Sequence, residues 1–412
     1  MRVVVIGSGI VGAGAAYYLT GRGATVTVVD GAYPGEATQA GAGIVCPWVD
    51  HPEDDDWYQL TREGARHYPG LVEELGEDIG YAKVGALLVA EDPADLEPVR
   101  ALLRRRYLDA PEMGEVTDVD TPSELFPPLS DTLSALLVPG AARVDGCAVR
   151  DALLNAAVAR GAEVRTAAAT LTPDGQVHLH PVPGSMDGEP GAPAEPGSRT
   201  QAGAVGSAGG ASWRQAAPLS PGTPPPAPTG IRTFTGEGVP LEADAVIVAA
   251  GAWTGEVCRP LGVELPVFPR RGQILHATLE GVDTAWWPMV LPNVGPYLLG
   301  FPDARVVIGA TVEDVGFAPR VTMGGLQEVI EAGLRIAPGL FGATVSEVRV
   351  GLRPVYAPGP ALIGPLSHRV VVATGLSAYG LTAGPFTGRI AAALALGEEP
   401  PLDITPYAPA IG

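Results

Sequence analysis

The sequence predicts an α/β fold in which a discontinuous Rossmann-type domain carries an inserted, mainly antiparallel α+β domain. Three observations support this prediction. The first thirty residues read as strand, helix and strand around a glycine-rich turn. Buried-strand patterns return at 241–251 and 369–374, in the middle and near the end of the chain. Between them, residues 265–279 and 297–311 alternate as strands of an antiparallel sheet do.

The opening unit is typical of dinucleotide binding. Arg2–Ile6 is a short apolar run rich in β-branched residues, which predicts a buried parallel strand. The next six residues, Gly7-Ser8-Gly9-Ile10-Val11-Gly12, match G-x-G-x-x-G. Residues 13–19 predict a helix, and residues 25–29 predict a second strand that ends at Asp30.

The order of these residues fits the chemistry of a pyrophosphate site. Gly7 allows the tight turn, Gly9 lets the backbone approach the phosphates, and Gly12 lets helix and strand pack closely. N–H groups of the first helical turn then face the phosphates, and Asp30 can accept hydrogen bonds from a ribose hydroxyl. The alternative is a structural turn that holds no ligand.

Composition narrows the class of protein. The chain has 412 residues, enough for two or three domains, and a formal net charge of −20. Lys83 is the only lysine, so nucleic acid and anionic membranes are not expected partners. No apolar run is long enough to span a bilayer, and we expect no signal or transit peptide before the first strand. Three scattered cysteines suggest neither disulfides nor zinc, and favour the cytoplasm.

The remaining elements follow from hydrophobic periodicity. Helices are expected at 56–75, 92–107, 144–159, 324–337 and 385–396, and further strands at 85–90 and 163–166. A loop is expected at 375–384. Residues 181–229 are rich in Pro, Gly, Ala and Ser, which predicts a disordered insertion in a hairpin formed by 176–180 and 231–234.

These patterns predict two domains, each discontinuous in sequence. The dinucleotide-binding domain comprises 1–80, 141–180, 230–262 and 341–412. The second domain, which we expect to bind the substrate, comprises 81–140 and 263–340.

Seven short segments, taken in order, resemble a known family. They are Val5–Gly12, Ala37–Ile44, Val246–Trp253, Arg271–Gln273, Gly309–Thr311, Gly351–Pro354 and Ala373–Pro385. With these segments the chain resembles the FAD-dependent D-amino-acid oxidases and glycine oxidases, which are often grouped with D-amino-acid dehydrogenases. The resemblance covers most of the chain but not the insertion.

The resemblance implies one non-covalently bound FAD, and the chain holds no second glycine fingerprint that would bind another dinucleotide. Its ADP half is expected at Gly7, Gly9, Ile10, Val11, Gly12 and Asp30. The loop along the flavin is expected to comprise Thr38, Gln39, Ala40, Gly41, Gly43 and Ile44. Gly251 and the last glycine loop, with Gly375, Tyr379, Gly380, Leu381 and Thr382, complete the implied cofactor site.

The resemblance also implies two residues that contact the substrate. Arg353 would clamp the carboxylate of an amino acid, as a guanidinium does with two parallel hydrogen bonds. The alternative is a structural ion pair with a carboxylate such as Glu347. Tyr297 would steady the same carboxylate, the alternative being a core aromatic. The chain departs from some relatives at Ala378, where they carry an arginine, and it has no lysine after Lys83.

We therefore predict an enzyme that oxidises an amino acid or related amine by hydride transfer to FAD. The imine would hydrolyse to a 2-oxo acid, and D-amino acids or glycine- and sarcosine-like amines are the favoured substrates. Alternatives are a dehydrogenase that reduces a quinone or acceptor protein, a tailoring amine oxidase of a biosynthetic pathway, and a non-catalytic flavin-binding subunit. No metal is expected, and nothing indicates the oligomeric state.

Overall fold

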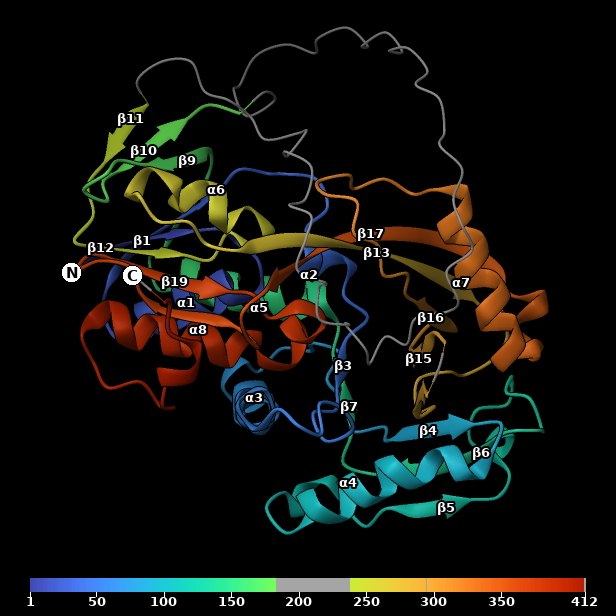
Figure 1. Ribbon diagram of the computed structural model, residues 1–412. Helices are drawn as coiled ribbons and strands as arrows, with labels where there is room; N and C mark the ends of the chain where they lie inside the picture. Colours follow the sequence, from blue (N-terminus) through green and yellow to red (C-terminus); the bar gives the residue numbers. More distant parts are fainter. Residues whose placement is uncertain (183–237, 294, 411–412) are drawn as a thin grey trace, which may run out of the picture.

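The computed structural model describes residues 1–182, 238–293 and 295–410 (Figure 1). They form two large sheets with their helices, and α/β and antiparallel parts are both present as the sequence predicts. The proposed insertion and its second hairpin strand at 231–234 lie outside the described residues, apart from 181–182. Among the described residues, the strand at 177–180 pairs on its two sides with the strands at 168–171 and 239–241. The division into two domains stays a prediction.

The first sheet has six strands and is parallel except at one edge. Its order is β18 (Leu362–Pro365), β19 (Val370–Thr374), β12 (Ala245–Val248), β1 (Arg2–Ile6), β2 (Thr25–Asp30) and β8 (Glu163–Thr166). The edge strand β18 runs antiparallel to β19. The other neighbouring pairs are parallel, so the carboxyl ends of five strands meet at one edge of the sheet.

Helices and a small sheet cover the two faces of this first sheet. Side chains of β1 alternate, so that Val3 and Val5 pack towards the helices while Val4 and Ile6 pack on the opposite face. The helical layer contains α1 (Ile10–Gly21), α3 (Asp55–Leu75), α5 (Gly146–Ala159) and α8 (Gly380–Leu396). The opposite layer contains α6 (Thr254–Cys258) and the sheet of β9 (Ala168–Leu171), β10 (Val177–His180) and β11 (Val239–Leu241).

The second sheet has eight strands and is mainly antiparallel. Its order is β17 (Thr344–Tyr356), β13 (Val267–Thr278), β16 (Arg305–Gly309), β15 (Tyr297–Phe301), β14 (Met289–Pro292), β4 (Ala86–Ala90), β6 (Ser134–Val138) and β5 (Thr117–Val119). Helix α7 (Met323–Ile336) packs on one face and α4 (Glu97–Tyr107) on the other. Three short elements, α2 (Ala37–Ala40), β3 (Ile44–Val45) and β7 (Ala142–Arg143), lie between the two large sheets.

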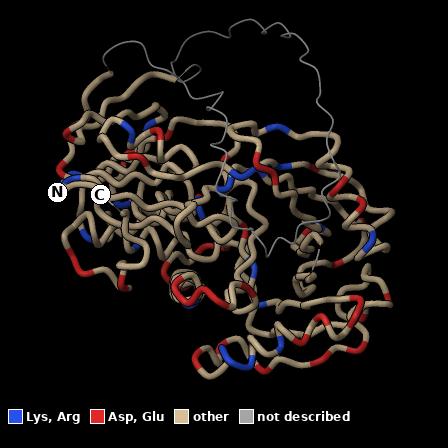
Figure 2. The backbone as a smooth tube through the Cα atoms, viewed as in Figure 1, with Lys and Arg blue, Asp and Glu red and all other residues tan. Residues whose placement is uncertain are grey.

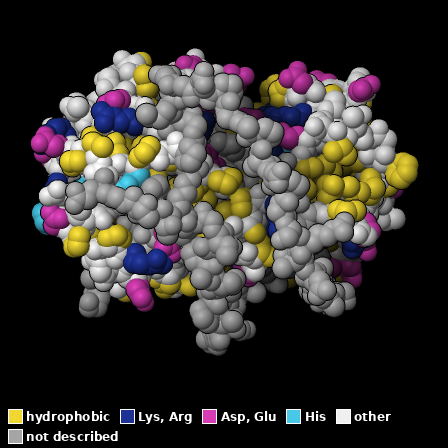
Figure 3. Space-filling view, turned by 90° about the horizontal axis from the view of Figure 1, so that it is seen from above, with side chains coloured by type: hydrophobic (Ala, Val, Ile, Leu, Met, Phe, Trp, Pro, Cys, Tyr) yellow, Lys and Arg dark blue, Asp and Glu magenta, His cyan; other side chains and the backbone are white. Residues whose placement is uncertain are grey.

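Strands β13 and β17 form a long ribbon that runs between the two parts of the molecule (Figure 1). Their antiparallel register extends from the Val267–Tyr356 pair to the Thr278–Thr344 pair. Figure 2 shows charges of both signs distributed over the chain, with basic positions where β13 and β17 run together. Figure 3 shows apolar side chains grouped on the α7 side, where Met323 and Phe341 are exposed.

Several expected boundaries differ from the structure. The run 297–311 is a hairpin, because Asp303 and Ala304 take left-handed backbone conformations and turn the chain between β15 and β16. Helix α1 begins at Ile10, three residues earlier than predicted. No helix among the described residues is long and apolar enough to cross a membrane.

The closing helix begins at Gly380, so the predictions of a loop through residue 384 and a helix from Pro385 were wrong. Proline has no N–H to donate to the carbonyl four residues earlier, here that of Leu381. Instead, the buried hydroxyl of Tyr68, on α3, donates to the Leu381 carbonyl. A partner distant in sequence thus satisfies the carbonyl, and the helix tolerates Pro385 in its second turn.

Replacing Tyr68 with Phe should destabilise the fold by about 1–2 kcal/mol, because it leaves a buried carbonyl without a donor. Urea unfolding followed by circular dichroism measures the change. Tyr107→Phe is the matched control, since Tyr107 is 42% exposed. Equal unfolding midpoints for the two variants would contradict this role for Tyr68.

Candidate functional site

A long cavity opens at the carboxyl ends of the parallel strands and extends to the β13–β17 ribbon. It encloses about 2010 Å³ of space not filled by atoms, including the part open to solvent. The ends of β1, β2, β12 and β19 all contribute to its wall. This edge of an open parallel sheet is the expected place for a ligand.

The glycine turn brings the backbone to one end of the cavity. Gly7 has φ +104°, and a Cβ there would collide with the carbonyl of Ala249. A Cβ on Gly12 would collide with the carbonyl of Gly7. Gly7 and Gly9 line the cavity together with Ile10 and Val11, whereas Gly12 lies behind the wall and permits the close packing.

Asp30 lines the cavity and also holds the glycine turn. Its Oδ2 accepts from the Ser8 N–H at 2.8 Å and from the Ser8 hydroxyl at 2.6 Å. Its Oδ1 accepts from the Ala32 N–H at 2.7 Å. The carboxylate therefore fixes the turn, a structural role that the sequence did not indicate.

The loop after β2 forms the middle of the wall. Thr38, Ala40, Gly41, Gly43 and Ile44 line it, and Thr38 Oγ1 accepts from the Ile10 N–H at 3.0 Å. Gly43 has φ +98°, and a Cβ there would collide with the Val144 carbonyl.

Two predicted residues hold this loop from behind. Gln39 lies outside the lining, and its carbonyl accepts from Arg349 Nη1 at 3.1 Å. Thr382 also lies outside the lining, and its hydroxyl donates to the Ile44 carbonyl at 2.9 Å. The Gln39 carbonyl and the Thr382 hydroxyl can therefore position the loop from outside the lining.

The last glycine loop and the start of α8 form a further part of the wall. Gly375, Tyr379, Gly380 and Leu381 line the cavity, as Gly251 does. A Cβ built on Gly380 or Gly251 would meet no atom within 4 Å, so both backbones face open space. The N-termini of α1 and α8 therefore both border the cavity, and their dipoles favour negative charge there.

A buried polar cluster that sequence reasoning missed supports Tyr379. Its hydroxyl donates to Oδ2 of the buried Asp50 at 2.9 Å. Arg106 Nη1 donates to the carbonyls of Trp48 and Asp50, at 2.8 and 2.6 Å. His51 stacks on Trp57, and burial lowers its pKa. Because Asp50 and Tyr379 are 329 residues apart, no local pattern could reveal this pair.

Arg353 and Tyr297 meet at the far end of the cavity, and both line it. Arg353 Nη1 donates to the Thr311 carbonyl at 3.1 Å. Its guanidinium lies over Gly272, where a Cβ would overlap it. Burial raises the pKa of the Tyr297 phenol, although the nearby Arg353 opposes that rise. Glu347 pairs with Arg349 at 2.8 Å, which leaves the alternative Arg353–Glu347 pair unformed.

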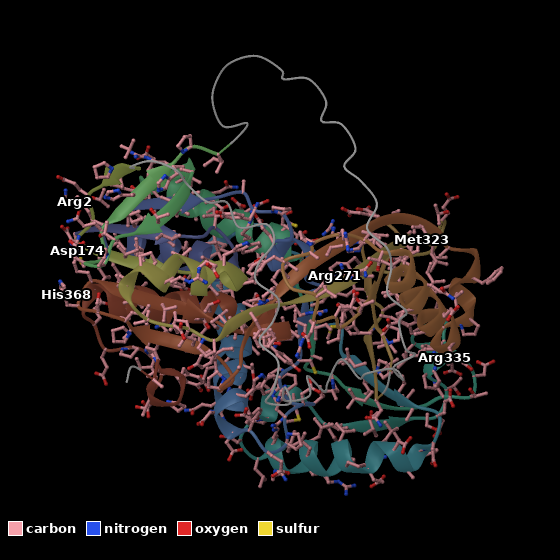
Figure 4. All side chains as sticks on the ribbon, turned by 45° about the horizontal axis from the view of Figure 1, so that its top comes forward. Arg2, Asp174, Arg271, Met323, Arg335 and His368 are labelled. Atoms are coloured by element: carbon pink, nitrogen blue, oxygen red, sulfur yellow. The ribbon has the colours of Figure 1, made fainter. Side chains whose placement is uncertain are left out.

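Arg270 also lines this end and was not among the predicted site residues. Its Nε and Nη2 donate to the two carboxylate oxygens of Asp314, at 2.8 and 3.2 Å. The neighbouring Arg271 pairs with Glu313 and does not line the cavity (Figure 4). The sequence could have indicated this residue, because Arg270 and Arg271 are consecutive on a strand. Since side chains of a strand alternate, one of the two arginines had to face the cavity.

His276, on β13, lies outside the main cavity. Its buried Nε2 has no hydrogen-bond partner among the described residues. Burial first, and then Arg349 and Arg305, lower the pKa of His276 to about 4, although Glu347 and Asp145 oppose this. The position is that of a neutral structural histidine.

Comparisons with known proteins agree with this geometry. The family model described as "FAD dependent oxidoreductase" matches residues 2–229 and 227–394. An uncharacterized oxidoreductase, YurR of Bacillus subtilis, is 38% identical over 99% of this chain and 98% of its own length. The structure of iminodiacetate oxidase from Chelativorans sp. BNC1 is 39% identical, covers 99% of both chains and superposes with a TM-score of 0.83. Glycine oxidase from Geobacillus kaustophilus, 23% identical over both whole chains with a TM-score of 0.73, shares the fold.

Gly380→Val should weaken FAD binding at least tenfold without lowering the stability of the apoprotein. The new side chain would enter the open space of the cavity. Replacing a helical glycine at a position with no neighbouring atoms does not lower the stability of the fold. Equilibrium dialysis and apoprotein unfolding measure the two effects. Gly342→Val, at an exposed and equally unobstructed glycine, is the control. FAD affinity equal to that of the control would show that this backbone does not face the cofactor.

Acid should destabilise the fold partly through His276. Its pKa is about 4 when folded and about 6.5 when unfolded, so between these values the unfolded state binds more protons. The contribution of His276 to the free energy of unfolding is therefore fully present above about pH 6.5, where the ring is neutral in both states. It is lost as the pH falls towards 4. His276→Gln should reduce the slope of unfolding free energy against pH in that window, by up to about 1.4 kcal/mol per pH unit.

The control for this pH profile is His368→Gln, because His368 is exposed at the far edge of the first sheet (Figure 4). Unfolding is measured at several pH values between 4 and 7. An unchanged slope in His276→Gln would contradict the assignment of the buried ring as neutral.

Proposed function

The chain belongs to the FAD dependent oxidoreductase family, and from this premise we propose that it oxidises an amino acid or related amine that carries a carboxylate. The observation that carries the proposal is the Arg353 guanidinium on the cavity wall beside the buried Tyr297. A guanidinium there can bind a carboxylate with two parallel hydrogen bonds. The iminodiacetate oxidase, which is 39% identical, supports an amine flanked by carboxymethyl groups as the substrate.

The residues of the chain would fit FAD in one orientation. The glycine turn and Asp30 would hold the ADP half, and the loop of residues 38–44 and the start of α8 would hold the flavin. When bound, FAD supplies an acceptor for two electrons and one hydrogen as hydride. Backbone N–H groups at the two helix N-termini would stabilise negative charge on the cofactor.

The substrate would be positioned by its carboxylate. Arg353 binds the carboxylate, and the Tyr297 hydroxyl, whose pKa is raised by burial, stays protonated and can donate to it. This fixes the α-carbon against the cofactor, so that the C–H bond breaks with its electron pair while the nitrogen lone pair forms the C=N bond. The nitrogen proton is lost to solvent, and water hydrolyses the imine to a 2-oxo acid and an amine. The described cavity lining offers no histidine for a base, and this route requires none.

The electron acceptor defines a second candidate, a dehydrogenase that passes electrons to a quinone or a carrier protein. The observation that favours it is the cavity lining, which contains no lysine among the described residues. We also propose a cytoplasmic location, because the three cysteines are scattered along the sequence and suggest no disulfide framework.

An anaerobic absorbance titration of the holoenzyme tests the proposed function. The flavin bands should bleach with at least one member of a panel of D-, L- and N-substituted amino acids. Admitting air then distinguishes an oxidase, which recolours quickly, from a dehydrogenase. Flavin that no carboxylate-bearing amine bleaches would contradict the proposal and favour a non-catalytic subunit.

Arg353→Leu should raise the apparent KM for the substrate at least 30-fold, because a charge-assisted bidentate contact contributes about 2 kcal/mol or more. FAD should remain bound, which the absorbance of the purified variant reports. Arg335→Leu removes an exposed arginine from α7 and is the control (Figure 4). A KM equal to that of the control would exclude Arg353 as the carboxylate-binding group.

A further inference from the structure

Strand β13 presents one arginine to the cavity and one to the opposite face. Because side chains of a strand alternate, Arg270, Gly272 and Ile274 form the row that lines the cavity. Arg271 and Gln273 form the other row, and both hydrogen-bond to Glu313. Arg271 is thereby committed to a structural ion pair, and Arg270 is the arginine of β13 that a ligand in the cavity can reach.

Arg270 lies directly opposite Arg353 in the antiparallel register of β13 and β17. Like charges at directly opposite positions on one face of a sheet destabilise it. Arg353 turns its guanidinium over Gly272, two residues along β13 from Arg270. The Arg270 guanidinium leans the other way along β13, 5.6 Å from the centroid of the Phe268 ring, so the two positive charges are separated along the cavity wall.

Among the described residues, no acidic residue of the cavity lining pairs with either arginine, and Arg270 pairs with Asp314, which lies outside the lining. Three acidic residues line the cavity, and their described hydrogen bonds or ion pairs join other groups. Asp30 accepts from Ser8, Glu36 accepts from Gln39, and Glu256 pairs with Arg259. The end of the cavity that holds Arg270 and Arg353 therefore favours an anionic ligand and presents two guanidiniums to it.

Asp314 fixes the orientation of Arg270 and leaves part of the guanidinium for a ligand. Its carboxylate accepts hydrogen bonds from Nε and Nη2 of Arg270. These two nitrogens form one of the two edges at which a guanidinium binds a carboxylate. The Nη1 side can still donate to a second anion. The side chain of Arg270 is 6% exposed and that of Asp314 is 51% exposed, so the aspartate approaches from the solvent side.

We propose that Arg270 binds a second carboxylate of the substrate, so that the preferred substrate is an amine with two carboxylates. One carboxylate binds Arg353 beside the reacting carbon, and the other binds Arg270 further along β13. This inference rests on the proposed function, because it assigns a substrate class to the same cavity. The second carboxylate is either on the nitrogen substituent, as in iminodiacetate, or on the side chain, as in aspartate.

The test compares substrates that differ by one carboxylate. The value of kcat/KM is measured for iminodiacetate, for D- and L-aspartate, and for sarcosine and alanine as monocarboxylate partners, with wild-type protein, Arg270→Gln and the exposed control Arg335→Gln. The wild type and the control should prefer a dicarboxylate at least tenfold over its partner. In Arg270→Gln the ratio of the two kcat/KM values should fall at least tenfold. The pair that shows this change identifies where the second carboxylate lies.

A binding measurement separates recognition from chemistry. Diglycolate and methoxyacetate carry two carboxylates and one, respectively, and lack the amine. Perturbation of the bound flavin spectrum should give a tighter Kd for diglycolate in the wild type, and Arg270→Gln should remove most of that difference. Arg270→Lys keeps the charge but not the planar fork, so it should retain an intermediate preference and also serves if the Gln variant does not fold.

The outcomes distinguish this inference from the proposed function. Two results would overturn the role of Arg270 and leave the proposed function intact. In one, the wild type oxidises monocarboxylate and dicarboxylate amines with equal kcat/KM. In the other, Arg270→Gln lowers kcat/KM equally for both. Failure of every amine to bleach the flavin would overturn the proposed function, and the inference with it.

Discussion

The antiparallel pairing of β13 with β17 is the constraint on which the candidate substrate site depends. Its register places Arg270 opposite Arg353 and Gly272 opposite Gly351, so that one face of the ribbon carries the guanidiniums and the space they need. Because side chains alternate, a slip of one residue would put Arg271 in place of Arg270. Glu313 opposes such a slip, since it pairs with Arg271 on the other face.

The cofactor end depends on a different constraint, the close approach of backbone segments. Gly7, Gly12 and Gly43 lie where a Cβ would collide with a carbonyl of another segment. These contacts bring two helix N-termini to the cavity in a chain of net charge −20 with one lysine. Positive potential in the cavity therefore comes from backbone dipoles and from arginines held in place by carboxylates or carbonyls.

The sequence predicted the parts of the fold that local patterns determine. The parallel strands, the glycine turn and the long amphipathic helix α3 appear within a few residues of their expected positions. The start of α8 was missed because it depends on Tyr68, far away in sequence.

For the site, resemblance to a family supplied Arg353 and Tyr297, which the structure brings together at one end of the cavity. Gly12, Gln39 and Thr382 were predicted to bind the cofactor but lie behind the lining. Arg270 was missed because alternation shows that two neighbouring residues face opposite ways without showing which one faces the ligand. The most direct test of the account is a crystal structure of the holoenzyme with diglycolate. The account predicts one carboxylate on Arg353 and the other on Arg270, whereas a second carboxylate directed to solvent or to another group would contradict it.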